Sequence, residues 1–502
     1  MSPVQIPDSP PETLPRRLSC AGWRARAIPF AALALAVLAA LALHRPPAAI
    51  SAPDSPNVVV IMTDDQTVSQ TRVMKITQRQ LRDRGVSFTR SFASFPLCCP
   101  SRATFLTGQH SHNHGVLGNG TPIGGFQALD QPNTLGVWLQ NAGYHTMQVG
   151  KFLNGYGRPN PTYIPPGWDE WVAAPDTTTN RYFNYSLNEN GTLVHYGGAA
   201  ADYKTDVYAD FAVDAIRNRG ALGPAADPFF LFVGFTAPHL PANPAPRHAH
   251  RFGGVRAPKP PSFNEANVSD KPRFIRRIKR FTARKVRRIS ANHRNQLRTL
   301  LSVDQAVGRI VAELSATGQL GDTFVVFTSD NGFFTGEHRL AKGKYLPYEP
   351  SLRVPLIIRG PGLAHGRRSE ELVSNVDLAP TILDLAGATA THPVDGRSLL
   401  PYARNPGLRS NRPIFIEANT VDDPSVGLPY IGLRTKRYKY VRYRTGEEEL
   451  YDLKRDPNEL RSRARSRSYR RTKRALKRAA QRYSACAGAS CRAPLGAVPP
   501  PR

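Results

Sequence analysis

The sequence predicts an α/β fold in which helices flank a mostly parallel sheet, followed by a smaller domain built on an antiparallel sheet. Short continuous apolar runs recur along the first 400 residues, which is typical of parallel strands buried on both faces. Helix-like stretches that end in glycine lie between these runs. Beyond about residue 400, apolar and polar residues alternate instead, which favours antiparallel strands with one buried face.

The first predicted strand is the run PNVVVIMTDD at residues 56–65, whose valine and isoleucine residues favour a buried strand. Similar apolar runs follow at residues 145–150, 227–235, 323–332 and 354–362. The helical stretches between them are TLGVWLQNAG at 134–143 and NQLRTLLSVDQAVGRIVAELSATG at 295–318. The alternating segments PIFIEA, YIGLRTKRYKYVRYR and EELYDL occupy residues 413–453. We therefore expect four parts: an N-terminal segment at 1–53, a main α/β domain at 54–400, a small C-terminal domain at 401–460 and a basic tail at 461–502.

The N-terminal segment has the features of an export signal. Four arginines precede an apolar run at residues 27–43, and a stretch rich in proline and alanine follows it. The length of this run is near the minimum of about 17 residues for a helix that spans a bilayer. A cleaved signal peptide and a retained membrane anchor therefore both fit, and in either case the body of the protein is expected to be exported.

Positive charge is concentrated in two runs of this 502-residue chain, whose formal net charge is +29. Residues 271–288 contain 10 basic residues and no acid, and residues 461–482 contain 11 basic residues and no acid. Such runs either bind a polyanion, such as an acidic polysaccharide or anionic lipid, or form solvated helix faces and a disordered tail. Nucleic acid is not an expected partner, because the chain is predicted to be exported and no aromatic stacking platform interleaves the charges.

Cysteine is rare, with five residues in the chain. Cys486 and Cys491 could close a small disulfide loop in an oxidising compartment. Cys98 and Cys99 are adjacent in the segment FPLCCPSRATFLTG and have no obvious partner. Disulfide bonding, metal binding and a reactive thiol are all possible roles for this pair.

Two pairs of polar residues follow predicted strands at the point where each strand ends. Asp64 and Asp65 follow the first strand, and Asp330 and Asn331 follow the apolar residues of the run at 323–332. Ligands of open α/β sheets bind outside the carboxyl ends of the strands, so the two pairs can share one site. Three carboxylates and an amide oxygen suit Ca²⁺ or Mg²⁺ rather than zinc. Helix caps and turns are the alternative explanation for either pair alone.

The segment CCPSRATFLTG resembles the signature of the type I sulfatases, in which Cys-x-Pro-Ser-Arg precedes Leu-Thr-Gly. The first cysteine of that signature is oxidised to Cα-formylglycine (3-oxoalanine) by a formylglycine-generating enzyme. The resemblance therefore makes Cys98 the modified residue and leaves Cys99 as a small buried side chain. It extends from about residue 56 to about residue 460 and implies an alkaline-phosphatase-like fold. The implied cation is calcium, with magnesium as the less favoured alternative, and its implied ligands are Asp64, Asp65, Cys98, Asp330 and Asn331.

Other motifs of the resemblance imply the residues that hold the sulfate group. Lys151 in VGKFLNGYG, His239 in TAPHLP and Lys344 in GKYLPYE match these positions. Many sulfatases have a histidine two residues after the first of these lysines, whereas this chain has Leu153 followed by Asn154. The N-acetylglucosamine-6-sulfatase branch shares this variant, so Asn154 is a candidate for the missing substrate contact.

The implied mechanism uses the hydrate of formylglycine at position 98, which has two hydroxyl groups. The cation lowers the pKa of one hydroxyl, Arg102 balances the resulting charge, and this oxygen attacks the sulfur of a sulfate ester. Lys151 and Lys344 would stabilise charge on the sulfate oxygens, and His239 would bind sulfate or transfer a proton. The second hydroxyl then expels sulfate and restores the aldehyde.

The segments HSHNHGV, PPGWDEW and FNYSLNENGTLVHYG are most similar to N-acetylglucosamine-6-sulfatases and extracellular heparan endosulfatases. A sulfated glycan such as N-acetylglucosamine 6-sulfate is the implied substrate, and aryl sulfates are possible further substrates. Two alternatives remain. A phosphatase or phosphodiesterase of the same superfold would use serine or threonine with two zinc ions, and would have histidine at the place of Asn331. A catalytically inert glycan-binding protein would result if Cys98 remained a thiol.

Overall fold

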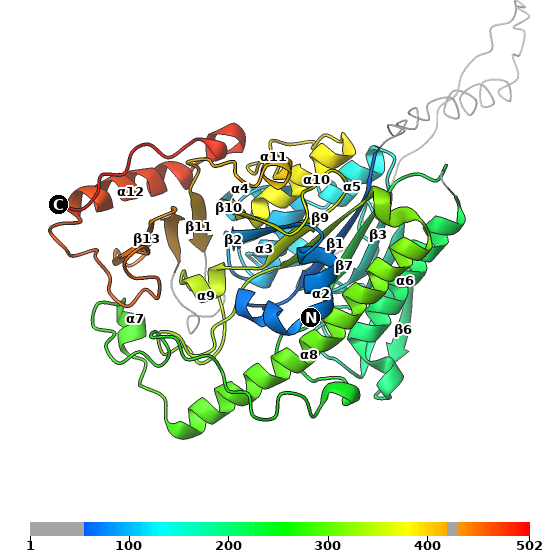
Figure 1. The fold of residues 1–502 in the computed structure, drawn as a ribbon, viewed down its shortest axis with the longest axis horizontal. Coiled ribbons are helices and arrows are strands. Elements are labelled where there is room, and N and C mark those ends of the chain that lie inside the picture. Colours follow the sequence, from blue (N-terminus) through cyan, green and yellow to red (C-terminus); the bar gives the residue numbers. More distant parts are fainter. Residues whose placement is uncertain (1–54, 224, 419–428) are drawn as a thin grey trace, which may run out of the picture. The chain divides into compact units, whose positions relative to one another are not determined.

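A ten-stranded sheet forms the centre of the main domain in the computed structural model, which describes residues 55–223, 225–418 and 429–502 (Figure 1). Its strand order is β10-β2-β9-β8-β1-β7-β3-β4-β5-β6. The strands are β1 (Asn57–Thr63), β2 (Val86–Phe92), β3 (His145–Gly150), β4 (Glu170–Ala173), β5 (Tyr185–Glu189), β6 (Thr192–Tyr196), β7 (Phe229–Gly234), β8 (Thr323–Ser329), β9 (Leu356–Arg359) and β10 (Arg367–Ser374).

The central strands β8, β1, β7, β3 and β4 are parallel, which confirms the predicted mostly parallel sheet. Strand β9 differs from the prediction, because it runs antiparallel to both of its neighbours, β8 and β2. Strands β5 and β6 are also antiparallel and end the sheet on the other side. Continuous apolar runs therefore identified buried strands but not the direction of each one.

Strand β1 shows why the central strands are apolar throughout. Val58 and Val60 face one hydrophobic core, and Val59 and Ile61 face a second core on the opposite side of the sheet. Because successive side chains of a strand point to opposite faces, a strand covered on both sides needs apolar residues at every position.

Helices cover both faces of the large sheet. Helices α3, α5 and α10 contribute to the first core, and α6 and α8 contribute to the second. The α-helices are α2 (Lys75–Thr77), α3 (Cys98–Thr107), α4 (Ser111–His114), α5 (Leu135–Asn141), α6 (Lys204–Ala221), α7 (Arg273–Arg276), α8 (Ala283–Ala316), α9 (Glu349–Leu352), α10 (Leu378–Ala386), α11 (Leu400–Arg404) and α12 (Arg470–Tyr483). Helix α8 begins 12 residues before the predicted helix, so it includes part of the first basic run.

The predicted small antiparallel sheet is confirmed as four strands in the order β11-β12-β13-β14. They are β11 (Ile414–Ala418), β12 (Tyr430–Arg434), β13 (Tyr438–Tyr443) and β14 (Glu448–Asp452). One face, which includes Ile416 and Tyr443, packs with Phe95 and Tyr345 of the main domain. The other face, which includes Leu433 and Leu450, packs against helix α12.

The C-terminal segment, residues 461–502, is folded rather than a disordered tail. Helix α12 buries Leu476 and Ala480 against the small sheet, and Cys486 and Cys491 form the predicted disulfide. Apolar residues spaced along one side of a basic helix explain this packing, since they supply a buried face beside a charged one.

No helix among the residues that the structure describes is long and apolar enough to cross a membrane. The apolar run at residues 27–43, for which a signal peptide or an anchor was predicted, lies outside the described residues.

Candidate active site

The carboxyl ends of β1 and β8 bring the two predicted pairs of polar residues together. The strands are adjacent and parallel, with Thr63 opposite Ser329, so Asp64 and Asp330 leave the sheet at the same edge. The backbone N–H of Asp65 donates a hydrogen bond to Asp330 Oδ1 at 3.2 Å. Asp65 has a φ of 68°, a left-handed conformation that aspartate tolerates better than most residues do.

Helix α3 carries Cys98 as its first residue and Arg102 one turn later. The Cys98 Sγ lies 3.6 Å from Asp64 Oδ1, which places position 98 at the same sheet edge. Arg102 Nε donates to Asp330 Oδ2 at 2.9 Å, and Arg102 Nη1 donates to the backbone oxygen of Lys151 at 2.7 Å. The helix ends at Gly108, whose φ of 64° terminates it in the left-handed conformation.

Three further basic side chains, for which a role in sulfate binding was predicted, lie at the same sheet edge. Lys151 follows β3 and forms a buried ion pair with Asp64. Lys344 Nζ lies 2.5 Å from Asp65 Oδ1 and 2.7 Å from Cys98 Sγ. His239 Nε2 lies 3.8 Å from Asp65 Oδ2. The side chains of His239 and Lys344 are 21% and 11% exposed, whereas that of Lys151 is 1% exposed, so a ligand would meet His239 and Lys344 first.

The residues present fit a hard cation. Oxygen atoms of Asp64, Asp65 and Asp330 lie within 4.8 Å of one another, and all three side chains are buried. Asn331 Nδ2 donates to Asp65 Oδ1 at 2.6 Å, while Asn331 Oδ1 is buried and has no hydrogen-bond partner in the described part of the chain. A buried amide oxygen is costly to leave unpaired, and an oxygen-rich group of this kind is the ligand set that Ca²⁺ and Mg²⁺ prefer.

Burial and neighbouring charges shift the pKa values of the acidic groups in this cluster, downward for Asp64 and upward for Asp330 and Cys98. Burial alone would raise the pKa of Asp64, but Lys151, His239 and Lys344 bring it below its usual range. Burial and the adjacent charge of Asp64 raise the pKa of Asp330 to about 6. Burial and Asp64 also raise the pKa of the Cys98 thiol to about 12, so an unmodified Cys98 is a protonated, weak nucleophile at neutral pH.

Asn154 has its backbone close to Cys99, near the start of helix α3. Its backbone oxygen accepts from the Phe126 N–H at 2.7 Å and lies 3.9 Å from Cys99 Sγ. Its side-chain Oδ1 is buried without a partner among the described residues. Leu153 packs in the hydrophobic core of the sheet, so it cannot replace the histidine found in many sulfatases. The assignment of Asn154 to substrate binding stays a prediction.

Sequence reasoning missed two asparagines that hold helix α3. Asn119 Oδ1 accepts from the backbone N–H of Cys99 at 3.0 Å, next to the start of the helix. Asn375 Nδ2 donates to the backbone oxygen and the hydroxyl of Ser101, at 3.1 Å and 2.9 Å. Asparagine in a loop has many uses, so the only signal for Asn375 was its place in the motif SNVDLAP.

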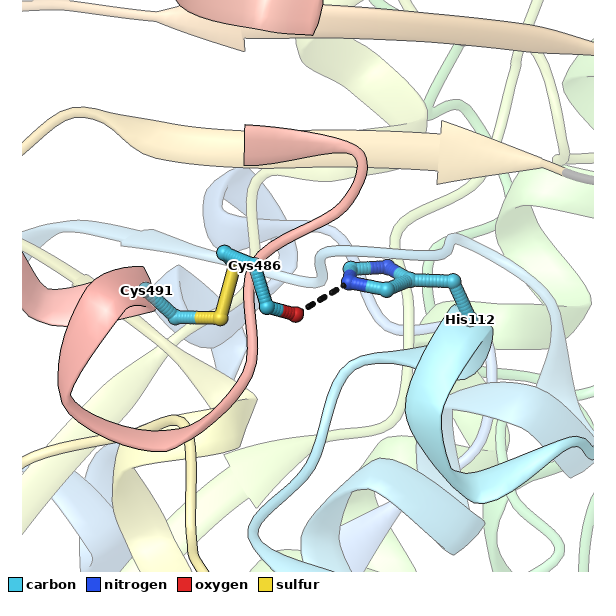
Figure 2. A group of neighbouring side chains, drawn as sticks. All are labelled: His112, Cys486 and Cys491. Carbon is cyan, nitrogen blue, oxygen red and sulfur yellow. Dashed lines mark hydrogen bonds between the residues drawn. A yellow bond between two sulfur atoms is a disulfide. The ribbon is translucent and has the colours of Figure 1, made fainter. Parts of the chain in front are cut away.

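A histidine on the neighbouring helix α4 has a structural role. His112 Nδ1 pairs with Glu417 Oε2 at 3.0 Å, and His112 Nε2 lies 2.9 Å from the backbone oxygen of Cys486 (Figure 2). Cys486 and Cys491 approach this histidine closely enough to suggest a metal site, but their sulfur atoms are joined in a disulfide. A disulfide lacks the thiolates that bind metals, so this group connects the C-terminal segment to the main domain.

The fold and this cluster of charged residues define an α/β protein with a candidate cation site at the edge of its sheet. The sulfatase family model matches residues 56–388, and the model of the C-terminal region of N-sulphoglucosamine sulphohydrolase matches residues 336–485. The chain belongs to the sulfatase family.

Curated relatives agree with this assignment. The chain is 39% identical over 365 residues to the extracellular sulfatase SULF-1 homolog of Drosophila melanogaster, which covers 71% of this chain and 32% of that protein. It is 37% identical over 362 residues to the N-acetylglucosamine-6-sulfatase of Homo sapiens, covering 70% of this chain and 64% of that enzyme. It is 34% identical over 489 residues to an arylsulfatase of Volvox carteri, covering 85% of this chain and 73% of that protein. The chain thus spans about a third of the first of these relatives and under two thirds of the second.

Solved structures share the fold. One, described as a complex with its substrate D-glucosamine-2-N,6-O-disulfate, superposes with a TM-score of 0.72 at 26% identity and covers 85% of this chain and 97% of that chain. The phosphonate monoester hydrolase of Silicibacter pomeroyi superposes with a TM-score of 0.67 at 23% identity, covering 85% and 95%. The second likeness concerns the fold alone.

Proposed function

We propose that this protein hydrolyses sulfate esters of sulfated saccharides, with N-acetylglucosamine 6-sulfate as the model substrate and aryl sulfates as smaller alternatives. One observation carries the proposal: the side chain at position 98 lies against Asp64 and Lys344 at the same sheet edge as the carboxylates of Asp65 and Asp330. Family membership and the names of the relatives support the type of reaction and the sugar.

The nucleophile of this proposal is Cys98 after oxidation to formylglycine. A formylglycine-generating enzyme that draws on an external oxidant would replace the sulfur by an aldehyde oxygen. In the hydrated aldehyde, one hydroxyl loses its proton and forms a bond to the sulfate sulfur, while the bond from sulfur to the sugar oxygen breaks and the sugar leaves as an alcohol. The second hydroxyl then loses its proton as the bond from carbon to sulfate breaks, which releases sulfate and restores the aldehyde.

Arg102 is the proposed partner of the oxygen at position 98. Its guanidinium is held by Asp330 and by the backbone of Lys151, and its Nη2 has no partner among the described residues. A fixed positive group with a free donor can stabilise an alkoxide without reorganisation.

Lys151, Lys344 and His239 are the proposed sulfate-binding groups. The two lysines stay protonated, because neighbouring carboxylates raise their pKa against the opposing effect of burial. Burial lowers the pKa of His239, which favours a neutral ring that can donate or accept a proton. Asn154 remains the proposed additional substrate contact.

We propose calcium as the cation, held by Asp64, Asp65, Asp330, Asn331 and the oxidised side chain at position 98. When bound, such a cation lowers the pKa of an adjacent hydroxyl and attracts negative sulfate oxygens. Magnesium is the less favoured alternative, because it demands near-ideal octahedral geometry, whereas Ca²⁺ accepts more varied arrangements of oxygen ligands.

Export is also part of the proposal. The N-terminal sequence has the pattern of a signal or anchor, and relatives include proteins named extracellular sulfatases. The Cys486–Cys491 disulfide suits an oxidising compartment outside the cytosol.

The test compares the release of sulfate and phosphate by protein purified with calcium. We expect sulfate release from N-acetylglucosamine 6-sulfate and from an aryl sulfate, loss of release on chelation, and restoration by calcium. Cys98→Ala should remove turnover, because alanine cannot be oxidised to formylglycine. Release of phosphate from an aryl phosphate without sulfate release would support the phosphatase alternative. Substrate binding without turnover would support the inert glycan-binding alternative.

A further inference from the structure

The two basic runs, which are far apart in the sequence, both border the small antiparallel sheet. Helix α7 belongs to the first run and α12 to the second, and both lie on the left of the molecule in Figure 1. Residues 269–272, which lead into α7, line a groove of about 680 Å³ together with residues 445–448, Ser462, Ala464, Arg465 and Lys473. The groove therefore borders both runs, and we call the exposed basic residues of 271–288 and 461–482 the basic surface.

Hydrogen bonds fasten the two runs to each other. The backbone N–H of Ser462 donates to Asp270 Oδ2 at 2.5 Å, and Lys271 Nζ donates to the backbone oxygen of Leu460 at 3.0 Å. The backbone N–H of Arg273 donates to Glu447 Oε1 at 2.9 Å. Of the acids of the groove, Asp270 also pairs with Lys271, and Glu448 pairs with Lys473 and Lys477. None of these acids pairs with an exposed guanidinium group of either run within the described residues.

Most arginines of the two runs are exposed and lack ionic partners among the described residues, whereas Lys271, Lys473 and Lys477 form ion pairs. Nine basic residues between positions 273 and 288 and eight arginines between 461 and 482 are exposed. None of these exposed groups forms an ion pair within the described ranges of the chain. Arginines elsewhere on the surface do: Arg217 lies 2.9 Å from Glu313, and Arg309 lies 2.5 Å from Asp210. Like charges held close together repel, so a surface of this kind is best stabilised by an external polyanion.

We propose that the basic surface binds a linear sulfated polysaccharide and so holds polymeric substrate on the enzyme, outside the catalytic pocket. The choice of a sulfated polymer rests on the proposed function, whereas polyanion binding rests on the surface itself. Binding releases counterions from the polymer and gains free energy in proportion to the number of anionic groups neutralised. Catalysis at the pocket and retention of the polymer are separate tasks of two separate sites.

The surface is suited to a polysaccharide rather than to a bilayer or single-stranded nucleic acid. The exposed large apolar residues of the described chain are Tyr163, Ile164, Leu193, Leu222 and Leu408, and none belongs to the basic runs. The apolar side of α12 is buried against the small sheet. The basic surface therefore has, among the described residues, no apolar face for insertion into lipid and no exposed aromatic platform for stacking on bases.

The binding test uses size-fractionated heparin as the probe and Cys98→Ala as the background, so that no turnover alters the probe. The test variant carries Arg276→Gln, Arg280→Gln, Arg474→Gln and Arg478→Gln, two from each run. The matched control carries Arg158→Gln, Arg217→Gln, Arg247→Gln and Arg309→Gln, which removes the same charge from exposed arginines that have ionic partners.

We expect the slope of log affinity against log salt to fall by about 3 for the test variant, since each lost contact removes about 0.7 to 0.9. The control should change the slope by less than the amount expected for one lost contact. A double variant with only the two substitutions of one run should show about half of this decrease in slope, because both runs contact the same polysaccharide. Equal losses in test and control variants would overturn the proposal, and so would an effect confined to one run.

Two further probes separate the possible partners. Single-stranded DNA of matched charge and vesicles containing phosphatidylserine should bind more weakly than heparin at 150 mM salt; tighter binding of either would overturn the choice of a sulfated polysaccharide. With active enzyme, the test variant should hydrolyse an aryl sulfate normally and lose about tenfold in kcat/KM on desulfation of the polymer. Unchanged kcat/KM on the polymer would overturn its role in holding substrate. Heparin binding with the predicted variant dependence but no turnover of any sulfate ester would contradict the proposed function and leave the polyanion site intact.

Discussion

The proposed catalytic site and the basic surface differ in how their charges are balanced. In the pocket, Asp64 and Asp330 are fully buried and each is paired, with Lys151 and Arg102. On helix α12, Arg474 and Arg478 are exposed and have no ionic partner within the described residues. Buried charges must be paired, because an unpaired one costs several kcal/mol, so they fix geometry. Exposed charges contribute little to folding and are free to interact with a partner.

The two regions are connected at His112. This residue lies on α4, shortly after the helix that carries Cys98, and it contacts the backbone of Cys486 after α12 (Figure 2). Four variants, one of them at a buried residue outside both regions, test how differently buried and exposed groups contribute to stability.

The largest effect is expected for Arg102→Met. Methionine leaves Asp330 buried without its ion pair, so the free energy of unfolding should fall by about 3–5 kcal/mol. Sulfate release should be lost as well. Chemical denaturation measures the stability change, and Arg478→Met is the control, with an expected change within about 0.5 kcal/mol. Similar stability losses for both variants would remove the distinction between the two regions.

A buried histidine outside both regions gives the second prediction. Burial, with Arg72 and Arg294 nearby, lowers the pKa of His293 from 6.5 to about 4. The unfolded chain therefore takes up a proton at higher pH than the folded chain, so stability is lost as pH falls from about 6.5 to 4. His293→Gln should remove on the order of 3 kcal/mol of this dependence, at about 1.4 kcal/mol per pKa unit. Parallel stability–pH curves for wild type and variant would contradict the assignment.

Removing the C-terminal disulfide should have a moderate effect. The loop between Cys486 and Cys491 is short, and the chain-entropy model gives about 2 kcal/mol for such a crosslink. A variant with Cys486→Ala and Cys491→Ala should unfold at lower denaturant concentration yet retain turnover of aryl sulfate per folded molecule. Loss of turnover in the folded variant would show that the contact at His112 supports the catalytic pocket directly.

The smallest effect has the opposite sign. Arg474 and Arg478 are four residues apart on α12, where like charges destabilise a helix by about 0.2–0.5 kcal/mol. Arg474→Gln should therefore raise the free energy of unfolding by a few tenths of a kcal/mol at low salt, and this gain should vanish at high salt. A measurable loss of stability would mean that this arginine has a structural partner.

Prediction from sequence succeeded where one physical requirement dominates. Strands β1, β3, β7 and β8 are buried on both faces, so their apolar runs were recognisable. Strand β10 escaped notice because its first residues, Arg367 and Arg368, are exposed at the edge of the sheet. The start of α8 was missed for a similar reason: its first turns are exposed and basic and lack an apolar period.

The candidate site likewise contains residues whose positions could be predicted from the sequence and residues whose positions could not. The meeting of Asp64, Asp65, Asp330 and Asn331 followed from strand ends in a parallel sheet. Lys344 lies in a loop, so its position depended on the family resemblance and could not be derived from periodicity. That both basic runs border one groove was not predictable either, because it depends on how α7 and α12 pack around the small sheet.

The mass of the peptide that contains position 98, from protein purified from the cells that make it, tests the central claim most directly. The account predicts a peptide about 18 Da lighter than the cysteine form, as conversion of a thiol side chain to an aldehyde requires. An active enzyme whose peptide has the unmodified cysteine mass would contradict it.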